Sequence, residues 1–97
     1  MAVYVDLEDF KEYLRIEHKS EDVLIESLLE AASSAAENWC RAVFEEGAVP
    51  QEVLLAVKMH AGYHYEHRSE PDEKGYQAMM RAFHDLLAPY VDPDKMF

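Results

Sequence analysis

Three histidines share one side of a predicted helix in this chain. His60, His64 and His67 follow at i, i+4 and i+7, and Glu66 lies beside them. Imidazole and carboxylate groups bind zinc, but a catalytic zinc site needs three protein ligands in a fixed geometry. The zinc-protease pattern also requires a Glu directly after the first His of the pair, and this segment has none there. We therefore interpret these histidines as helix-edge residues and predict no metal site.

The other reactive side chains also lack the setting that catalysis needs. The 20 Asp and Glu residues are spread along the chain, with Glu26, Glu30 and Glu37 at predicted solvent-side positions. A general acid–base pair needs a pocket that separates two pKa values, and no pocket is indicated. Cys40 is the only cysteine and falls within an apolar helical pattern, so we expect a buried thiol and a reducing compartment. The sequence thus predicts no catalytic residue and no cofactor.

Length, composition and charge limit the class of protein. The chain has 97 residues, 49% of them hydrophobic, which suits one small globular domain. Its formal net charge of −11 repels phosphate, so we expect neither charge-driven nucleic-acid binding nor binding to an anionic membrane. The start MAVYVDLEDF does not read as a signal peptide, and no apolar run is long enough to span a membrane. We expect a single domain over residues 1–97, with a core over about 6–90 and an extended tail over 91–97.

Apolar residues recur with a helical period in the first half of the chain. Asp6 is placed to cap a helix of about two turns. Ser20 is placed to cap a second helix of about twenty residues, whose apolar pattern extends to Val43. Trp39 falls on the apolar side of this second helix, which predicts a core position for its indole.

A third helix is predicted over about residues 51–68. Pro50 is suited to begin it, because a proline in the first turn needs no amide partner. The helix is apolar nearly all round, a pattern typical of burial on more than one side. Leu55, Met59 and Tyr63 lie away from its main core stripe, so either another helix of the chain or another subunit could cover them.

A fourth helix follows a polar loop and is predicted over about residues 76–87. Pro89 lies just past its last apolar turn, so the helix should end near Ala88. On the third helix, Tyr65 is predicted to be a second core anchor beside Trp39. The predicted fold class is therefore all-α, a small bundle of about four helices with short loops.

The order of these segments resembles the head–tail connector (adaptor, or head-completion) family of tailed double-stranded DNA phages. Three motifs carry the resemblance, and they read Glu21-Asp22-Val23-Leu24-Ile25-Glu26, Tyr65-Glu66-His67-Arg68 and Leu86-Leu87-Ala88-Pro89-Tyr90. The residues interpreted as family-motif or structural positions are Trp39, Pro50, Tyr65, Glu66, Arg68, Leu86, Leu87, Pro89 and Tyr90. Glu66 and Arg68 are expected to form a structural or interface ion pair.

The resemblance implies a structural virion protein and not an enzyme. Copies would form a homo-oligomeric ring beneath the portal protein and touch their neighbours head-to-tail through two different surfaces. The ring would join the DNA-filled head to the tail or the next neck protein and extend the DNA channel, which DNA would cross without sequence-specific binding. The protein would lie at the virion neck, and in the bacterial host cytoplasm during assembly. Leu55, Met59 and Tyr63 are then possible subunit-interface residues.

Two other classes of protein stay open at this point. A small acidic regulator could bind a protein partner as an antirepressor or as a mimic of DNA, although a mimic should hold its carboxylates in one dense stripe. Here the carboxylates are distributed. A metal-dependent enzyme would have to use the three helix histidines and Glu66.

Overall fold

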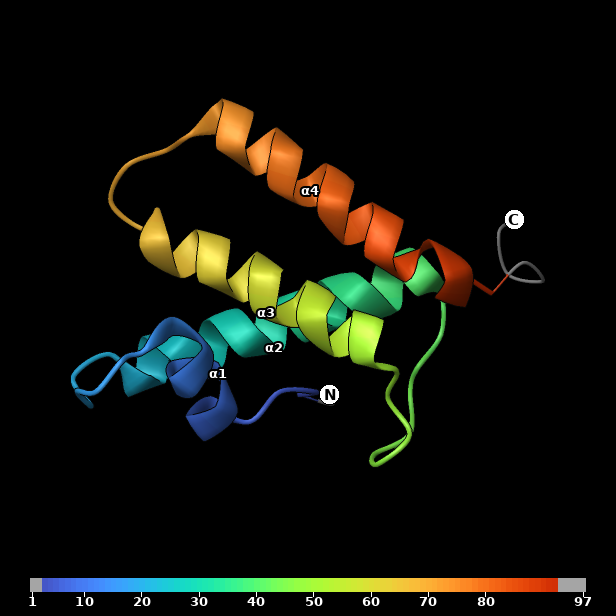
Figure 1. The fold of residues 1–97 in the computed structure, drawn as a ribbon, viewed down its shortest axis with the longest axis horizontal. Coiled ribbons are helices and arrows are strands. Elements are labelled where there is room, and N and C mark those ends of the chain that lie inside the picture. The colour runs from blue at the N-terminus through green and yellow to red at the C-terminus, as the bar shows by residue number, and fades with distance from the viewer. Residues whose placement is uncertain (1–2, 93–97) are drawn as a thin grey trace.

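The computed structural model describes residues 3–92, and this part of the chain folds into four α-helices and a short 3-10 turn (Figure 1). The elements in chain order are α1 (Leu7–Leu14), α2 (Asp22–Cys40), α3 (Gln51–Glu66), α4 (Glu73–Leu87) and the 3-10 turn η1 (Ala88–Tyr90). Between residues 3 and 92 no strand forms. The predicted all-α fold with short loops is confirmed.

The helix α3 lies at the centre of the bundle. It packs along α2 on one side and along α4 on another, and it runs antiparallel to both (Figure 1). The short helix α1 packs against the first part of α2 and also contacts α3. Three helices therefore surround α3, which explains why its sequence is apolar nearly all round.

The core consists of apolar side chains contributed by all four helices. The buried members are Phe10 of α1, Ile25, Leu29, Ala32, Ala36 and Cys40 of α2, Val53, Ala56, Val57, Ala61 and Tyr65 of α3, and Met79, Phe83 and Leu87 of α4. The small residues in the middle of α2 let α3 approach closely, because they leave shallow grooves for its side chains. Val5 of the N-terminal segment completes the core.

Two predicted helix ends differ from the structure. The helix α2 ends at Cys40, because Arg41 takes a left-handed conformation with φ of 54°. Val43, which continues the apolar pattern, lies outside the helix and is 74% exposed. The amide of Ala42 donates to the carbonyl of Glu37, which closes the last turn. The predicted third helix also runs two residues too far, since α3 ends at Glu66.

The starts of α2 and α4 also differ from the prediction. The predicted cap Ser20 is not used, because its hydroxyl contacts the His18 ring and Glu21 occupies the N-cap position of α2. The helix α4 begins at Glu73, three residues before the predicted start at Tyr76. Asp72 caps it by accepting a hydrogen bond from the Gly75 amide at 3.2 Å. The glycine in the first turn made this segment resemble a loop.

The N-terminal segment is fastened to α2 by Tyr4. Its amide donates to the buried Ser33 hydroxyl at 3.1 Å, and its own hydroxyl donates to Glu37 at 2.5 Å. The Phe44 amide donates to the same Tyr4 hydroxyl, so the segment also holds the chain that follows α2. The prediction that Glu37 faces open solvent was wrong, because Tyr4 covers it.

The chain after η1 returns to the end of α2, where the Asp92 amide donates to the Cys40 carbonyl at 2.9 Å. Val91 has an extended backbone, as predicted for the tail. Residues 93–97 of the predicted tail lie outside the described residues. Within the described residues, no helix has the length and apolar character to cross a membrane.

We predict that Gly62→Ala stabilises the protein. A methyl group at position 62 would meet Leu14 at 3.7 Å, which is ordinary van der Waals contact. Glycine inside a helix costs up to about 1 kcal/mol relative to alanine, so the free energy of unfolding should rise by about 0.5–1 kcal/mol. Urea unfolding measures this change, and a fall in stability would show that α1 packs closer to α3 than the structure indicates.

Candidate interaction surfaces

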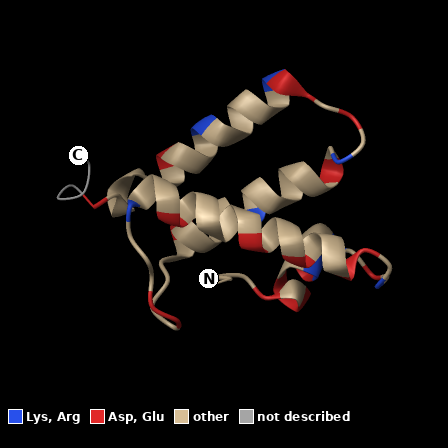
Figure 2. Cartoon of the chain, turned by 180° about the vertical axis from the view of Figure 1, so that it is seen from behind, with Lys and Arg blue, Asp and Glu red and all other residues tan. Residues whose placement is uncertain are grey.

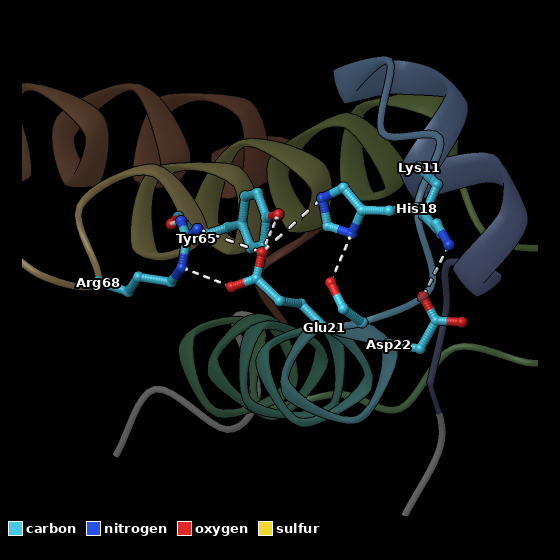
Figure 3. A network of polar contacts seen from close by, with 7 residues as sticks. Lys11, His18, Glu21, Asp22, Tyr65 and Arg68 are labelled. Atoms are coloured by element: carbon cyan, nitrogen blue, oxygen red, sulfur yellow. Dashed lines mark hydrogen bonds and ion pairs between the residues drawn. The ribbon is translucent and has the colours of Figure 1, made fainter.

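The carboxylate of Glu21 connects the start of α2 to the end of α3 (Figure 3). The Tyr65 hydroxyl donates to it at 2.7 Å, and the Arg68 Nε lies 2.8 Å from its second oxygen. The Arg68 guanidinium also stacks on the Tyr65 ring, 4.2 Å from the centroid. We name these three residues the Glu21 clamp. Two residues of the Tyr-Glu-His-Arg motif, Tyr65 and Arg68, therefore make contacts within the chain.

Electrostatics of the Glu21 clamp follow from its hydrogen bonds. The hydrogen bond from Tyr65 and the charge of Arg68 hold the pKa of Glu21 below its ordinary value. The same hydrogen bond, together with burial, raises the pKa of Tyr65. The predicted ion pair of Arg68 with Glu66 was wrong, because the guanidinium reaches back to α2. Glu66 is exposed.

A second ion pair joins α1 to α2 beside the Glu21 clamp (Figure 3). The ammonium of Lys11 lies 2.7 Å from an oxygen of Asp22. The Lys11 side chain is only 7% exposed, so its charge needs this partner. The ion pair therefore fixes α1 at the first turn of α2, and with it the position of every side chain that α1 presents to solvent.

The closing Leu-Leu-Ala-Pro-Tyr motif holds the opposite end of the bundle. Leu87 is buried, and its carbonyl accepts a hydrogen bond from the Cys40 thiol. Burial raises the pKa of Cys40, so the thiol stays protonated and unreactive. The Tyr90 ring meets Phe44 edge-on at 6.5 Å, and a hydrogen bond with Glu52 raises the pKa of Tyr90. The motif thus joins α4 to the ends of α2 and α3.

The family-motif residues are therefore distributed over both ends of the bundle and share no single cavity. Tyr65 and Arg68 belong to the Glu21 clamp, and Pro50 is the N-cap of α3. Leu87 lies in the core, with Leu86 at its edge. Pro89 and Tyr90 are part of η1. This arrangement is suited to holding helices in place.

Trp39 does not lie in the core, and this prediction was wrong. Its side chain is 43% exposed and stacks on the His84 ring with centroids 3.8 Å apart. Cys40, the next residue, takes the buried position instead. Adjacent residues on an α-helix are rotated by about 100° about its axis. With Cys40 in the core, the Trp39 indole therefore lies outside it and packs at the edge of α4.

The three predicted helix histidines have different surroundings along α3. Among residues 3–92 no group of three His, Cys, Asp or Glu side chains is placed to hold a metal ion. His67 stacks on Tyr63 at 4.3 Å, while His60 turns toward Phe83 of α4. His60 and His64 stay close, with ring centroids 4.7 Å apart. The histidines therefore line the contact between α3 and α4.

Among these three histidines, His60 has a buried ring nitrogen, Nδ1, without a hydrogen-bond partner among the described residues. Burial and the neighbouring His64 lower the pKa of His60 from 6.5 to about 4. The imidazole is therefore neutral near pH 7, and it packs as an apolar ring between α3 and α4.

One apolar face stays open, along the groove between α1 and α3. Tyr13 of α1 is 44% exposed and Leu55 of α3 is 41% exposed. Met59 and Tyr13 line a hollow that also includes Gly62, and the Lys58 ammonium lies 5.7 Å from the Tyr13 ring centroid. We name the four side chains Tyr13, Leu55, Lys58 and Met59 the α1–α3 face. Exposed apolar side chains grouped in this way are typical of protein interaction sites.

The predicted interface residue Tyr63 has a different environment from Leu55 and Met59. Its ring lies between His67 and Tyr76, and its hydroxyl donates to the Asp72 carbonyl. Tyr63 thus borders the hollow but is covered mainly by its own chain. Sequence reasoning missed Tyr13 and Lys58. Tyr13 follows Phe10 at i+3 on the apolar side of α1, and only the packing of α1 against α3 shows that its ring stays exposed.

We predict that Tyr65→Ala lowers the free energy of unfolding much more than Trp39→Ala does. Tyr65→Ala removes a buried ring and the Glu21 clamp, so it should cost about 3 kcal/mol. Trp39→Ala removes a half-exposed stacked ring and should cost about 1 kcal/mol or less. Thermal and urea unfolding of the two variants measure the difference, and equal losses would contradict the placement of Trp39 at the rim.

We predict that His60 makes the protein sensitive to mild acid. Above pH 6.5 the ring is neutral in both the folded and the unfolded chain, so its contribution is fully present. As pH falls from 6.5 toward 4, the unfolded chain binds a proton that the folded chain resists, and stability is lost. The loss should be about 1–2 kcal/mol after allowance for solvent screening.

Unfolding free energies between pH 7 and pH 4 measure this dependence. His60→Leu should flatten the part of the curve that His60 causes. Parallel curves for the unchanged protein and this variant would contradict the role of His60.

Comparison with known protein families gives a match over most of the chain. Residues 4–89 match the family described as phage gp6-like head-tail connector protein. This range covers α1 to α4 and enters η1, so it contains the Glu21 clamp, the α1–α3 face and nearly all of the closing motif. No curated protein and no solved structure matches the chain.

Proposed function

The chain belongs to the family of phage gp6-like head–tail connector proteins, and from this premise we propose that its copies form a ring beneath the portal protein. Membership makes it a structural component of the phage neck that interacts with head and tail proteins. The ring joins the DNA-filled head to the tail or to the next neck protein. The chain acts as one domain, because side chains from all four helices share one core.

The observation that carries this proposal is the α1–α3 face. Within the described chain α3 is covered by α1, α2 and α4, yet Leu55 and Met59 remain on a side that none of them covers fully. A monomer gains nothing from keeping a leucine and a tyrosine together in water. A ring covers such a face in every copy, because each subunit meets its neighbour through it.

The charge of the chain suits a channel through which DNA passes. With a net charge of −11, the ring has no surplus of cations to hold phosphates. The helix α2 carries acidic residues and no Lys or Arg, as Figure 2 shows from behind. We propose that DNA crosses the ring without sequence-specific binding, and that the ring assembles in the host cytoplasm before the tail attaches.

We predict that electron microscopy of the protein mixed with the portal protein encoded beside it shows a ring of added density beneath the portal. Leu55→Asp should abolish this ring, because an unpaired carboxylate buried in an apolar contact costs several kcal/mol. The variant should still fold, since Leu55 is not a core residue.

Val43→Asp is the matched control, because Val43 is an exposed valine on the loop after α2. It should bind the portal as the unchanged protein does, and circular dichroism should show equal helix content for both variants. If the unchanged protein at high concentration adds no density beneath the portal, the proposed function is contradicted.

A further inference from the structure

The α1–α3 face and the outer side of α2 point in opposite directions. The buried residues of α2 recur on one side of that helix, which faces α3. The exposed residues Val23, Ser27 and Ala31 lie on the other side, at i, i+4 and i+8. Figure 1 shows α1 and α3 in front of α2, and Figure 2 shows α2 in front of α3. A head-to-tail contact needs two such opposed surfaces on each subunit.

The outer side of α2 begins with an exposed apolar pair. Val23 is 81% exposed, more than any other large hydrophobic residue of the described chain, and Leu24 follows it. One and two turns beyond Val23, Glu26 and Glu30 are exposed on its side of the helix, next to the N-terminal segment. Neither carboxylate has a basic partner among the described residues. The α2 outer face, defined as Val23, Leu24, Glu26 and Glu30, thus combines an apolar projection with unpaired negative charge.

The α1–α3 face has the complementary features. Tyr13, Met59 and Gly62 line a hollow of about 280 Å³ that is open to solvent, with Glu66 and His67 also on its lining. The Lys58 ammonium lies 5.7 Å from the Tyr13 ring centroid and pairs with no carboxylate in the part of the chain described. A mainly apolar hollow and an unpaired cation therefore lie together on this face, where the α2 outer face offers an apolar side chain and unpaired carboxylates.

The spacing along the two helices also agrees. At about 1.5 Å per residue, Lys58 lies about 6 Å along the axis of α3 from Gly62, which lines the hollow. On α2, Glu26 and Glu30 lie about 4.5 Å and about 10 Å from Val23 along the axis. If α2 of a second copy runs antiparallel to α3 with Val23 over the hollow, Glu26 and Glu30 therefore each come within one helical turn of Lys58. The positive end of the α2 dipole then lies near Glu66.

We infer that the α2 outer face of one copy docks on the α1–α3 face of the next copy, with Val23 in the hollow and Glu26 or Glu30 paired with Lys58. This inference rests on the proposed ring, and it specifies which two surfaces form each contact. The contact is heterologous, so it propagates from subunit to subunit until the ring closes. It covers the apolar side chains that the isolated fold leaves in water.

Cysteine cross-linking on portal-bound rings tests the pairing. The variants are Val23→Cys and Met59→Cys, with buried Cys40 left in place and a short bismaleimide as the reagent. A mixture of the two single variants should give dimers only, and the double variant should give a ladder of higher multimers. Each single variant alone should give no cross-link, and Val43→Cys mixed with Met59→Cys should give none.

Two outcomes overturn the pairing while the ring stands. Met59→Cys that cross-links to itself would show a two-fold contact, and a ring seen by microscopy without the mixed cross-link would exclude these surfaces. A bare portal in the same preparation would instead overturn the proposed function, and the pairing with it.

A charge exchange tests the ion pair separately. Lys58→Glu should raise the concentration needed for half-occupancy of the ring by about tenfold, because it places like charges opposite each other. Glu30→Lys in the same chain should restore most of the loss. Lys74→Glu makes the same charge change on α4 and should have no effect. A loss that Glu30→Lys and Glu26→Lys both fail to restore would exclude the Lys58 pair.

Discussion

The structure depends on the need to cover α3 on every side. A helix that is apolar nearly all round cannot lie on a surface, because each uncovered side chain keeps its apolar area in water. The chain covers α3 with α2 along one side, α4 along another and α1 across a third. Residues 3–92 form no further helix that covers the remaining side, so Leu55 and Met59 stay at the surface. We propose that assembly supplies the missing cover.

Two sets of contacts keep α3 in the register that this arrangement needs. At one end the Glu21 clamp and the Lys11–Asp22 ion pair fix α1, α2 and α3 together. At the other end Tyr90 and Leu87 join α4 to α2 and α3. The motif residues thus fix the position of α1 relative to α3, and this position determines the shape of the α1–α3 face. Their contribution to interaction is indirect, because they position surfaces formed by other residues.

Helix number and fold class could be predicted from the sequence, because the apolar period is a local signal, and the family from the order of its motifs. Capping residues were a weaker guide, because Ser20 does not cap α2 whereas Asp72 does cap α4. Contacts between helices were harder to predict. Arg68 has a carboxylate nearby in sequence at Glu66, yet it pairs with Glu21, which lies far along the chain. Trp39 and Cys40 are neighbours on one apolar pattern, and only the rotation of α2 against α4 decides that Cys40 is buried. Lys11 carried no sign of burial, because its partner Asp22 belongs to another helix. The family match favours the connector role over a regulator or a metal enzyme.

The central claim is that assembly covers the one side of α3 that the fold leaves open. Hydroxyl-radical footprinting of the free protein and of its portal-bound form measures this directly, because Tyr13 and Met59 of the α1–α3 face react readily with hydroxyl radicals. Tyr76 of α4 is similarly exposed in the free chain and serves as the internal reference. The account predicts that oxidation of Tyr13 and Met59 falls on assembly relative to oxidation of Tyr76. Unchanged oxidation of both residues in the bound form would contradict it.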